Sequence, residues 1–179
     1  MHDRLAQGLR AHLAGDIASA EAAYRAVLAA DPACPDALHG LAVIIQRAGH
    51  PDQAVPMLRA AIAGAPARPE FHFNLGIALL KSGNATAACA AFEAAAKLRP
   101  DWPEAQYDLG NARREAGDLH GAARAFRQAL KLRPVYVQAE VNLANVLKDD
   151  GRLDQALSAY RRVLARDDEC PTHGALRPS

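Results

Sequence analysis

Glycine recurs in this chain at a constant interval of 34 residues, and this regularity limits the possible folds more than any other feature of the sequence. Prolines and alanines repeat with the same interval. The repeated residues are Gly15, Gly49, Gly83, Gly117 and Gly151, then Pro32, Pro66, Pro100 and Pro134, and then Ala20, Ala54, Ala88, Ala122 and Ala156. Such an interval indicates copies of one helical or stranded unit, each of which buries its apolar side by stacking on its neighbours.

Two helices fit into each interval. Glycine supplies the left-handed residue that ends a helix, and proline stops one because it lacks an N–H and clashes with the preceding turn. Between these breakers the apolar residues lie three and four apart, and alanine, the best helix former, dominates them. The expected first helices run near 2–14, 36–48, 69–82, 103–116 and 137–150, and the second helices near 17–30, 51–64, 85–98, 119–132 and 153–166.

Small and large side chains also recur in register. A glycine or alanine lies seven residues before each of the repeated glycines, at Gly8, Ala42, Gly76, Gly110 and Ala144. A large side chain lies four residues after each repeated alanine, at Tyr24, Leu58, Phe92, Phe126 and Tyr160. We expect the small residue to let the two helices of a unit touch and the large one to fill the gap beside them.

A unit of this length with Leu-Gly, then Gly, Ala-x-x-x-Phe and Pro resembles the tetratricopeptide repeat family. The copies "FNLGIALLKSGNATAACAAFEAAAKLRP" and "YDLGNARREAGDLHGAARAFRQALKLRP" carry the resemblance most fully. The resemblance implies an all-α, right-handed superhelical solenoid with a concave groove lined by the first helices. Five repeats would span 1–34, 35–68, 69–102, 103–136 and 137–170, followed by a flexible or loosely packed tail at 171–179.

Composition argues against several classes of function. The formal net charge of +1 gives no global field that would attract nucleic acid or an anionic membrane. No apolar run reaches the length of a membrane span, and no apolar signal core is present, so we expect a cytoplasmic protein. Scattered cysteines and histidines predict neither metal nor cofactor. No phosphate loop, nucleophile elbow or zinc-protease motif occurs, so we do not expect an enzyme.

The resemblance places fixed positions of each first helix on the concave face. In repeats one to three these positions are mostly apolar, and in repeats four and five they are amide-rich and charged. The expected groove residues are Leu9, His39, Val43, Phe73, Asn74 and Ile77, followed by Tyr107, Asp108, Asn111, Arg114, Asn142, Asn145 and Lys148. We expect a charge placed at Phe73 or Ile77 to abolish partner binding without loss of helix.

Asparagines recur at one of these positions, and an amide can pair with a peptide backbone through both donor and acceptor. The row resembles the tetratricopeptide region of O-linked N-acetylglucosamine transferases, as does "NLANVLKDDGRLDQALSAYRRVL". It is partial, since Ala6, Gly40 and Asp108 interrupt it. The alternative is that the asparagines cap neighbouring repeats. The cations that clamp acidic tails in co-chaperones are absent, so chaperone tails are not expected ligands.

The second helix of the last repeat keeps apolar residues where a further repeat would dock, at Leu157, Tyr160 and Leu164. This pattern predicts self-association through that end, continuation of the array in a longer chain, or cover by the tail. The function that the sequence favours is a protein–protein interaction scaffold, which holds a peptide or helical segment of a partner in its groove. The alternatives are the substrate-recognition array of a larger glycosyltransferase or sulfotransferase, and a self-assembling scaffold.

Overall fold

The computed structural model describes residues 2–168, and within them helices follow one another without a strand. The first helices of the pairs are α1 (His2–Leu13), α3 (Pro35–Arg47), α5 (Pro69–Lys81), α7 (Pro103–Glu115) and α9 (Val137–Asp149). The second helices are α2 (Ile17–Ala30), α4 (Pro51–Gly64), α6 (Ala85–Leu98), α8 (Leu119–Leu132) and α10 (Leu153–Asp168). These ranges confirm the all-α prediction. The predicted tail at 171–179 lies outside the described residues.

Each helix pair turns at one of the repeated glycines, whose φ angles lie between 77° and 93°. The turn after α5 shows how the chain reverses. Gly83 has a φ of 77°, and the N–H of Asn84 donates to the carbonyl of Leu79 at 2.9 Å. The Asn84 side chain then accepts from the N–H of Ala87 at 3.1 Å and caps the start of α6. The turn therefore needs a residue in the left-handed conformation, which glycine adopts without strain.

Aromatic rings fill the space inside the helix pairs, except in the second repeat. Phe92 of α6 is fully buried, and a Cβ atom on Gly76 of α5 would lie 2.7 Å from its ring. Phe126 stands in the same relation to Gly110, at 2.6 Å. In the second repeat the smaller Leu58 takes the place of the ring. The small and large positions seen in the sequence are thus the two sides of one close contact.

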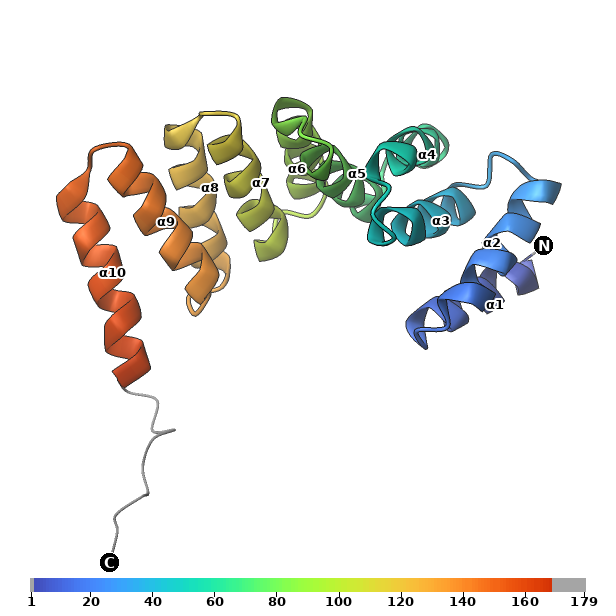
Figure 1. The fold of residues 1–179 in the computed structure, drawn as a ribbon, viewed down its shortest axis with the longest axis horizontal. Helices are drawn as coiled ribbons and strands as arrows, with labels where there is room; N and C mark the ends of the chain where they lie inside the picture. The colour runs from blue at the N-terminus through green and yellow to red at the C-terminus, as the bar shows by residue number, and fades with distance from the viewer. Residues whose placement is uncertain (1, 169–179) are drawn as a thin grey trace, which may run out of the picture.

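The helix pairs stack into an arch with α1 and α2 at one end and α10 at the other (Figure 1). Consecutive helices pack against each other, and every first helix also contacts the next first helix along the chain. Between 2 and 168, the backbones of the second helices do not approach one another in this way. The first helices therefore lie closer together than the second helices, so they form the inner side of the curve.

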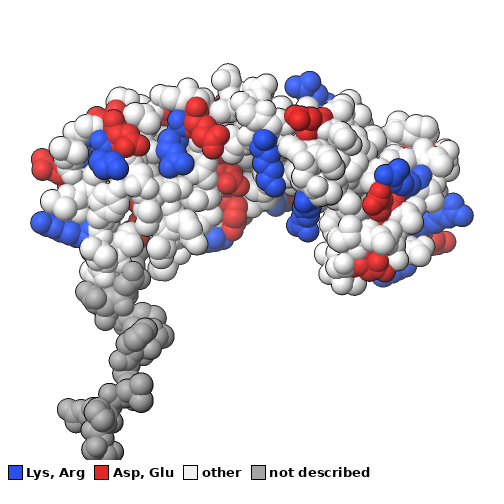
Figure 2. Space-filling model, viewed as in Figure 1, with Lys and Arg blue, Asp and Glu red and all other residues white. Residues whose placement is uncertain are grey.

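Charged side chains of both signs are interspersed over the face drawn in Figure 2. The face carries no broad field of one sign, in keeping with the formal net charge of +1. A bilayer span needs about 20 apolar residues in one helix. No helix in the described part of the chain combines that length with that character.

Candidate binding groove

The inner side of the arch holds a cavity of about 640 Å³ between α1, α3 and α5. Its apolar wall is formed by Leu5, Leu9, Leu13 and Val43. Leu9 is 55% exposed and Leu13 is 81% exposed, so both leucines offer apolar surface to solvent. Leu13 was not among the predicted groove residues. Its spacing of one helical turn from Leu9 is the signal that could have found it.

The tyrosine ring of the first repeat closes the back of this cavity. Tyr24 reaches from α2 to both neighbouring first helices, and a Cβ atom would lie 2.9 Å from the ring at Gly8 and 2.5 Å from it at Gly40. Gly40 occupies the position where repeats three and five carry Asn74 and Asn142. The ring leaves no room for an amide there, so the interruption of the asparagine row at Gly40 has a steric cause.

Asn74 joins α5 to the preceding first helix. Its amide group donates to the carbonyl of Glu70 at 3.1 Å and lies 2.8 Å from Nε2 of His39. A carbonyl can only accept, so the amide nitrogen faces both groups and Nε2 must accept as well. His39 is then neutral, with its proton on Nδ1. Burial is the main cause that lowers the pKa of His39 to about 4, which agrees with this assignment.

A second set of amides links α7 and α9. Asn142 donates to the hydroxyl of Tyr107 at 3.1 Å and to Oδ1 of Asn111 at 2.9 Å. Oδ1 of Asn145 accepts from the hydroxyl of Tyr160 at 2.6 Å. The donors of Asn74 and Asn142 therefore connect neighbouring first helices, Asn74 to α3 and Asn142 to α7.

Asp108 carries the negative charge of this polar zone. Burial raises its pKa to about 6, and Glu104 adds to the rise, while a hydrogen bond from Asn111 opposes it. Arg114 of the same helix is half-buried, whereas Lys148 is exposed and lies 3.9 Å from Asp149. The zone thus combines amides, two cations and a carboxyl group that ionises with difficulty.

The two apolar residues predicted for repeat three lie deeper than the sequence indicated. Phe73 packs between the rings of Phe92, at 5.6 Å, and Trp102, at 4.4 Å. Ile77 is partly buried and packs against the core between α5 and α6. The most exposed apolar residues of the groove are therefore Leu9 and Leu13 of α1. A charge at Phe73 would disturb ring packing as well as the groove.

Carboxylates at the start of the first helices are neutralised by arginines. Arg68 lies 3.2 Å from Asp36, and Arg99 pairs with Glu70. The guanidinium of Arg99 also covers the ring of Trp102 at 4.5 Å. The pair formed by Arg133 and Glu104 repeats this arrangement one unit later.

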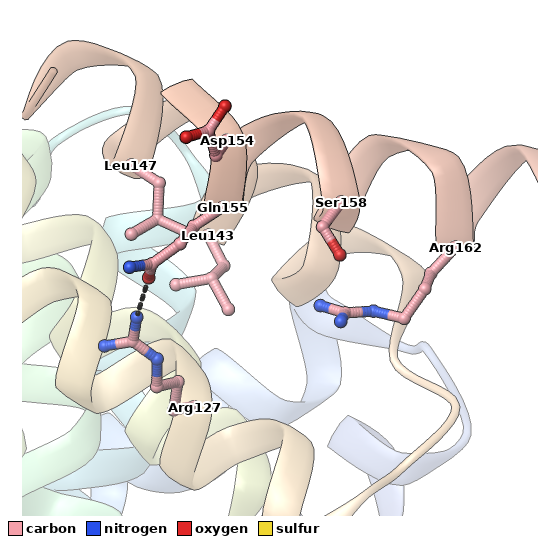
Figure 3. Close-up of a pocket in the computed structure, with 7 residues that line it drawn as sticks. All are labelled: Arg127, Leu143, Leu147, Asp154, Gln155, Ser158 and Arg162. Carbon is pink, nitrogen blue, oxygen red and sulfur yellow. Dashed lines mark hydrogen bonds between the residues drawn. The ribbon is translucent and has the colours of Figure 1, made fainter. Parts of the chain in front are cut away.

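A smaller cavity of about 330 Å³ lies away from the groove, between α8, α9 and α10 (Figure 3). Arg127 and Arg162 approach it from α8 and α10, and Arg127 donates to Gln155 at 3.4 Å. Leucines form its floor, and Asp154 adds a carboxylate at its edge. None of the predicted groove residues lines it.

The terminal helix α10 leaves several leucines uncovered by the described residues. Leu153 and Leu164 are each 63% exposed, and Leu157 is 49% exposed. Tyr160 differs from them, because it is partly buried and its hydroxyl donates to Asn145 of α9. In the described part of the chain, no group of three His, Cys, Asp or Glu side chains is placed to hold a metal ion.

Stacked helical hairpins with a continuous inner surface define a helical repeat protein that offers a surface to another protein. Family models described as tetratricopeptide repeat match residues 46–103 and 107–172, and a second such model matches 11–55. The chain therefore belongs to the tetratricopeptide repeat family. Repeats of this family are protein-interaction modules, and the chain is accordingly a protein–protein interaction scaffold of a non-catalytic repeat class.

Solved structures of MamA share the fold. One MamA structure is 24% identical with a TM-score of 0.86, over 99% of this chain and 97% of that chain. A MamA from Desulfovibrio magneticus RS-1 is 18% identical with a TM-score of 0.84, over 92% of this chain and 93% of that chain. At these identities the likeness concerns the fold. No curated protein matches the sequence.

Proposed function

We propose that the chain binds a segment of a partner protein along the inner side of the arch, with its main contact in the cavity between α1, α3 and α5. The observation that carries this proposal is the exposure of Leu9 and Leu13 beside a preformed space of about 640 Å³. Full burial of one leucine side chain contributes about 1.5–3 kcal/mol. Two such side chains, together with Val43, form the apolar centre that a protein interface needs.

The polar half of the groove would hold the backbone of the same segment. The donors of Asn74 and Asn142 are used within the solenoid, and no donor from the described residues reaches their Oδ1 atoms. These oxygens are placed to accept from the N–H groups of a bound chain. Arg114 and Lys148 add charged contacts. Such a surface suits an extended segment whose apolar residues lie at one end.

A photo-crosslinking experiment tests the groove. Benzoylphenylalanine replaces Leu13 in one variant and Leu98, which is 42% exposed on α6, in the control variant. In a lysate of the source organism we expect a discrete crosslinked partner from position 13 and none from position 98. The double variant Leu9→Asp, Leu13→Asp should lose that partner in a pull-down followed by mass spectrometry, with its helical circular dichroism unchanged. A partner retained by the double variant would contradict the proposal.

Self-association is a second candidate, favoured by the exposed face of α10. Leu130 and Ala123, which stand one repeat before Leu164 and Leu157, pack against the core that α9 completes. The described residues give Leu157 and Leu164 no such cover. We expect sedimentation equilibrium to reveal a dimer that the double variant Leu157→Glu, Leu164→Glu abolishes. The matched control Leu98→Glu on α6 should leave it intact, and a wild-type monomer at all concentrations would exclude this candidate.

A further inference from the structure

Two carboxylates and two arginines line the apolar cavity, and they are not all joined in ion pairs. At the end formed by the starts of α3 and α5, Asp36 and Glu70 are held by Arg68 and Arg99. At the other end stands Arg47, which lines the cavity and is exposed. None of the ion pairs among the described residues includes Arg47. The cavity thus has one cation, Arg47, that stands outside the ion pairs and beside the exposed leucines.

The next repeat supplies a second such cation. Lys81 stands 34 residues after Arg47, at the end of α5, and is likewise exposed. It also takes part in none of the described ion pairs. Cations in the last turn of a helix interact with the helix dipole. The helix dipole alone does not explain the two cations, because the equivalent residues of the later repeats are the carboxylates Glu115 and Asp149.

At this one position of the first helix, the sign of charge therefore changes along the chain of repeats. Arg47 and Lys81 stand at the ends of α3 and α5, and Glu115 and Asp149 stand at the ends of α7 and α9. Beside these carboxylates stand Arg114 and Lys148, so this half of the groove carries charges of both signs. A charge pattern of this kind fixes the direction and register in which a segment binds.

We propose that the cavity takes an acidic and aliphatic peptide segment, an inference that rests on the groove function proposed above. Aliphatic side chains of the segment occupy the space beside Leu9, Leu13 and Val43, and its carboxylates pair with Arg47 and Lys81. Neighbouring helix axes lie about 8–10 Å apart, and an extended chain advances about 3.3 Å per residue. Side chains of an extended chain point alternately to opposite sides, so two carboxylates two or four residues apart share one side of the segment and reach both cations. The segment binds extended, across the helices.

Selection from a phage-displayed library of random 12-residue peptides tests the proposal with the full chain. We expect the selected peptides to combine aliphatic residues with Asp or Glu, two of the acids being two or four positions apart. A fluorescein-labelled selected peptide should bind the double variant Arg47→Glu, Lys81→Glu at least tenfold more weakly than wild type in fluorescence anisotropy. The same peptide with Lys in place of its acids should regain affinity for that variant. Raising the salt concentration should weaken the wild-type complex.

Arg59→Glu provides the matched control, since Arg59 is exposed on the second helix α4 and does not line the cavity. It changes the net charge in the same direction as Arg47→Glu and should leave the anisotropy titration unchanged. Peptides that need Leu9 and Leu13 but show no acidic bias, and that bind the charge-reversed variant equally well, would overturn this inference and leave the groove function standing. Peptides that bind the double variant Leu9→Asp, Leu13→Asp as well as wild type would overturn the groove function itself.

Discussion

Phe92 lies so close to Gly76 that a Cβ atom on this glycine would stand 2.7 Å from two carbons of the ring. Real Cβ atoms do not approach other heavy atoms this closely, and the buried ring has little room to withdraw. In the second repeat the small residue is Ala42, and the large one is Leu58 instead of a ring. Glycine thus accompanies the ring in repeats where the ring is fully buried.

The variant Gly76→Ala should therefore be destabilised by about 1–3 kcal/mol, because the added methyl group overpacks the contact with Phe92. The better helix propensity of alanine offsets part of this cost. Urea denaturation followed by circular dichroism measures the change. The double variant Gly76→Ala, Phe92→Leu copies the natural pair of the second repeat. The double variant should lose less stability than the sum of the losses of the two single variants. Strict additivity would show that the contact between Gly76 and Phe92 does not cause the destabilisation.

The helix positions could be predicted from the sequence because their causes are local. A glycine with a φ of 77° at Gly83 and a proline at the start of α5 restrict the backbone whatever surrounds them. The helices consequently begin and end within a few residues of the expected ranges. The stacking follows as well, because amphipathic helix pairs of equal length have no other way to bury their apolar sides.

The side-chain partners could not be predicted, because they depend on how neighbouring repeats approach each other. His39 and Asn74 are 35 residues apart, and no local pattern shows that the amide donates to the imidazole. Trp102 lies in the connection before α7, yet its ring covers Phe73. The ring of Tyr24 likewise explains Gly40 only once α1 and α3 are placed. The extent of the open apolar surface therefore emerges from the structure alone.

The neutral state of His39 predicts a pH-dependent stability. Its folded-state pKa of about 4 lies below the ordinary value of 6.5, so at intermediate pH the unfolded chain binds the proton more tightly. The stabilisation is complete above about pH 6.5 and is lost as the pH falls through about 4. Relative to His39→Phe, the wild type should lose on the order of 2 kcal/mol between pH 7.5 and 4.5. Parallel urea curves for both proteins at these pH values measure this, and a constant difference would contradict it.

The raised pKa of Asp108 predicts that stability depends on pH in the opposite direction to that predicted for His39. Burial raises its pKa from 3.8 to about 6, so ionisation of this carboxyl group costs folding free energy as the pH rises through this range. Asp108→Asn removes the charge and restores the amide found at Asn74 and Asn142. We expect this variant to be more stable than wild type at pH 7.5 by on the order of 1–2 kcal/mol. The gain should disappear near pH 3.5, and a gain that is equal at both pH values would assign it to another cause.

Phe73 and Leu13 provide a last pair of predictions that separates the core from the groove. Phe73 packs between the rings of Phe92 and Trp102, whereas Leu13 is 81% exposed. Phe73→Ala should lower the free energy of unfolding by about 3 kcal/mol, because it leaves a gap beside two rings. Leu13→Ala should change it by less than about 0.5 kcal/mol. Thermal and urea denaturation compare the two variants. A stable Phe73→Ala protein would place this ring on the open surface of the groove, where a partner and not Trp102 would be its main contact.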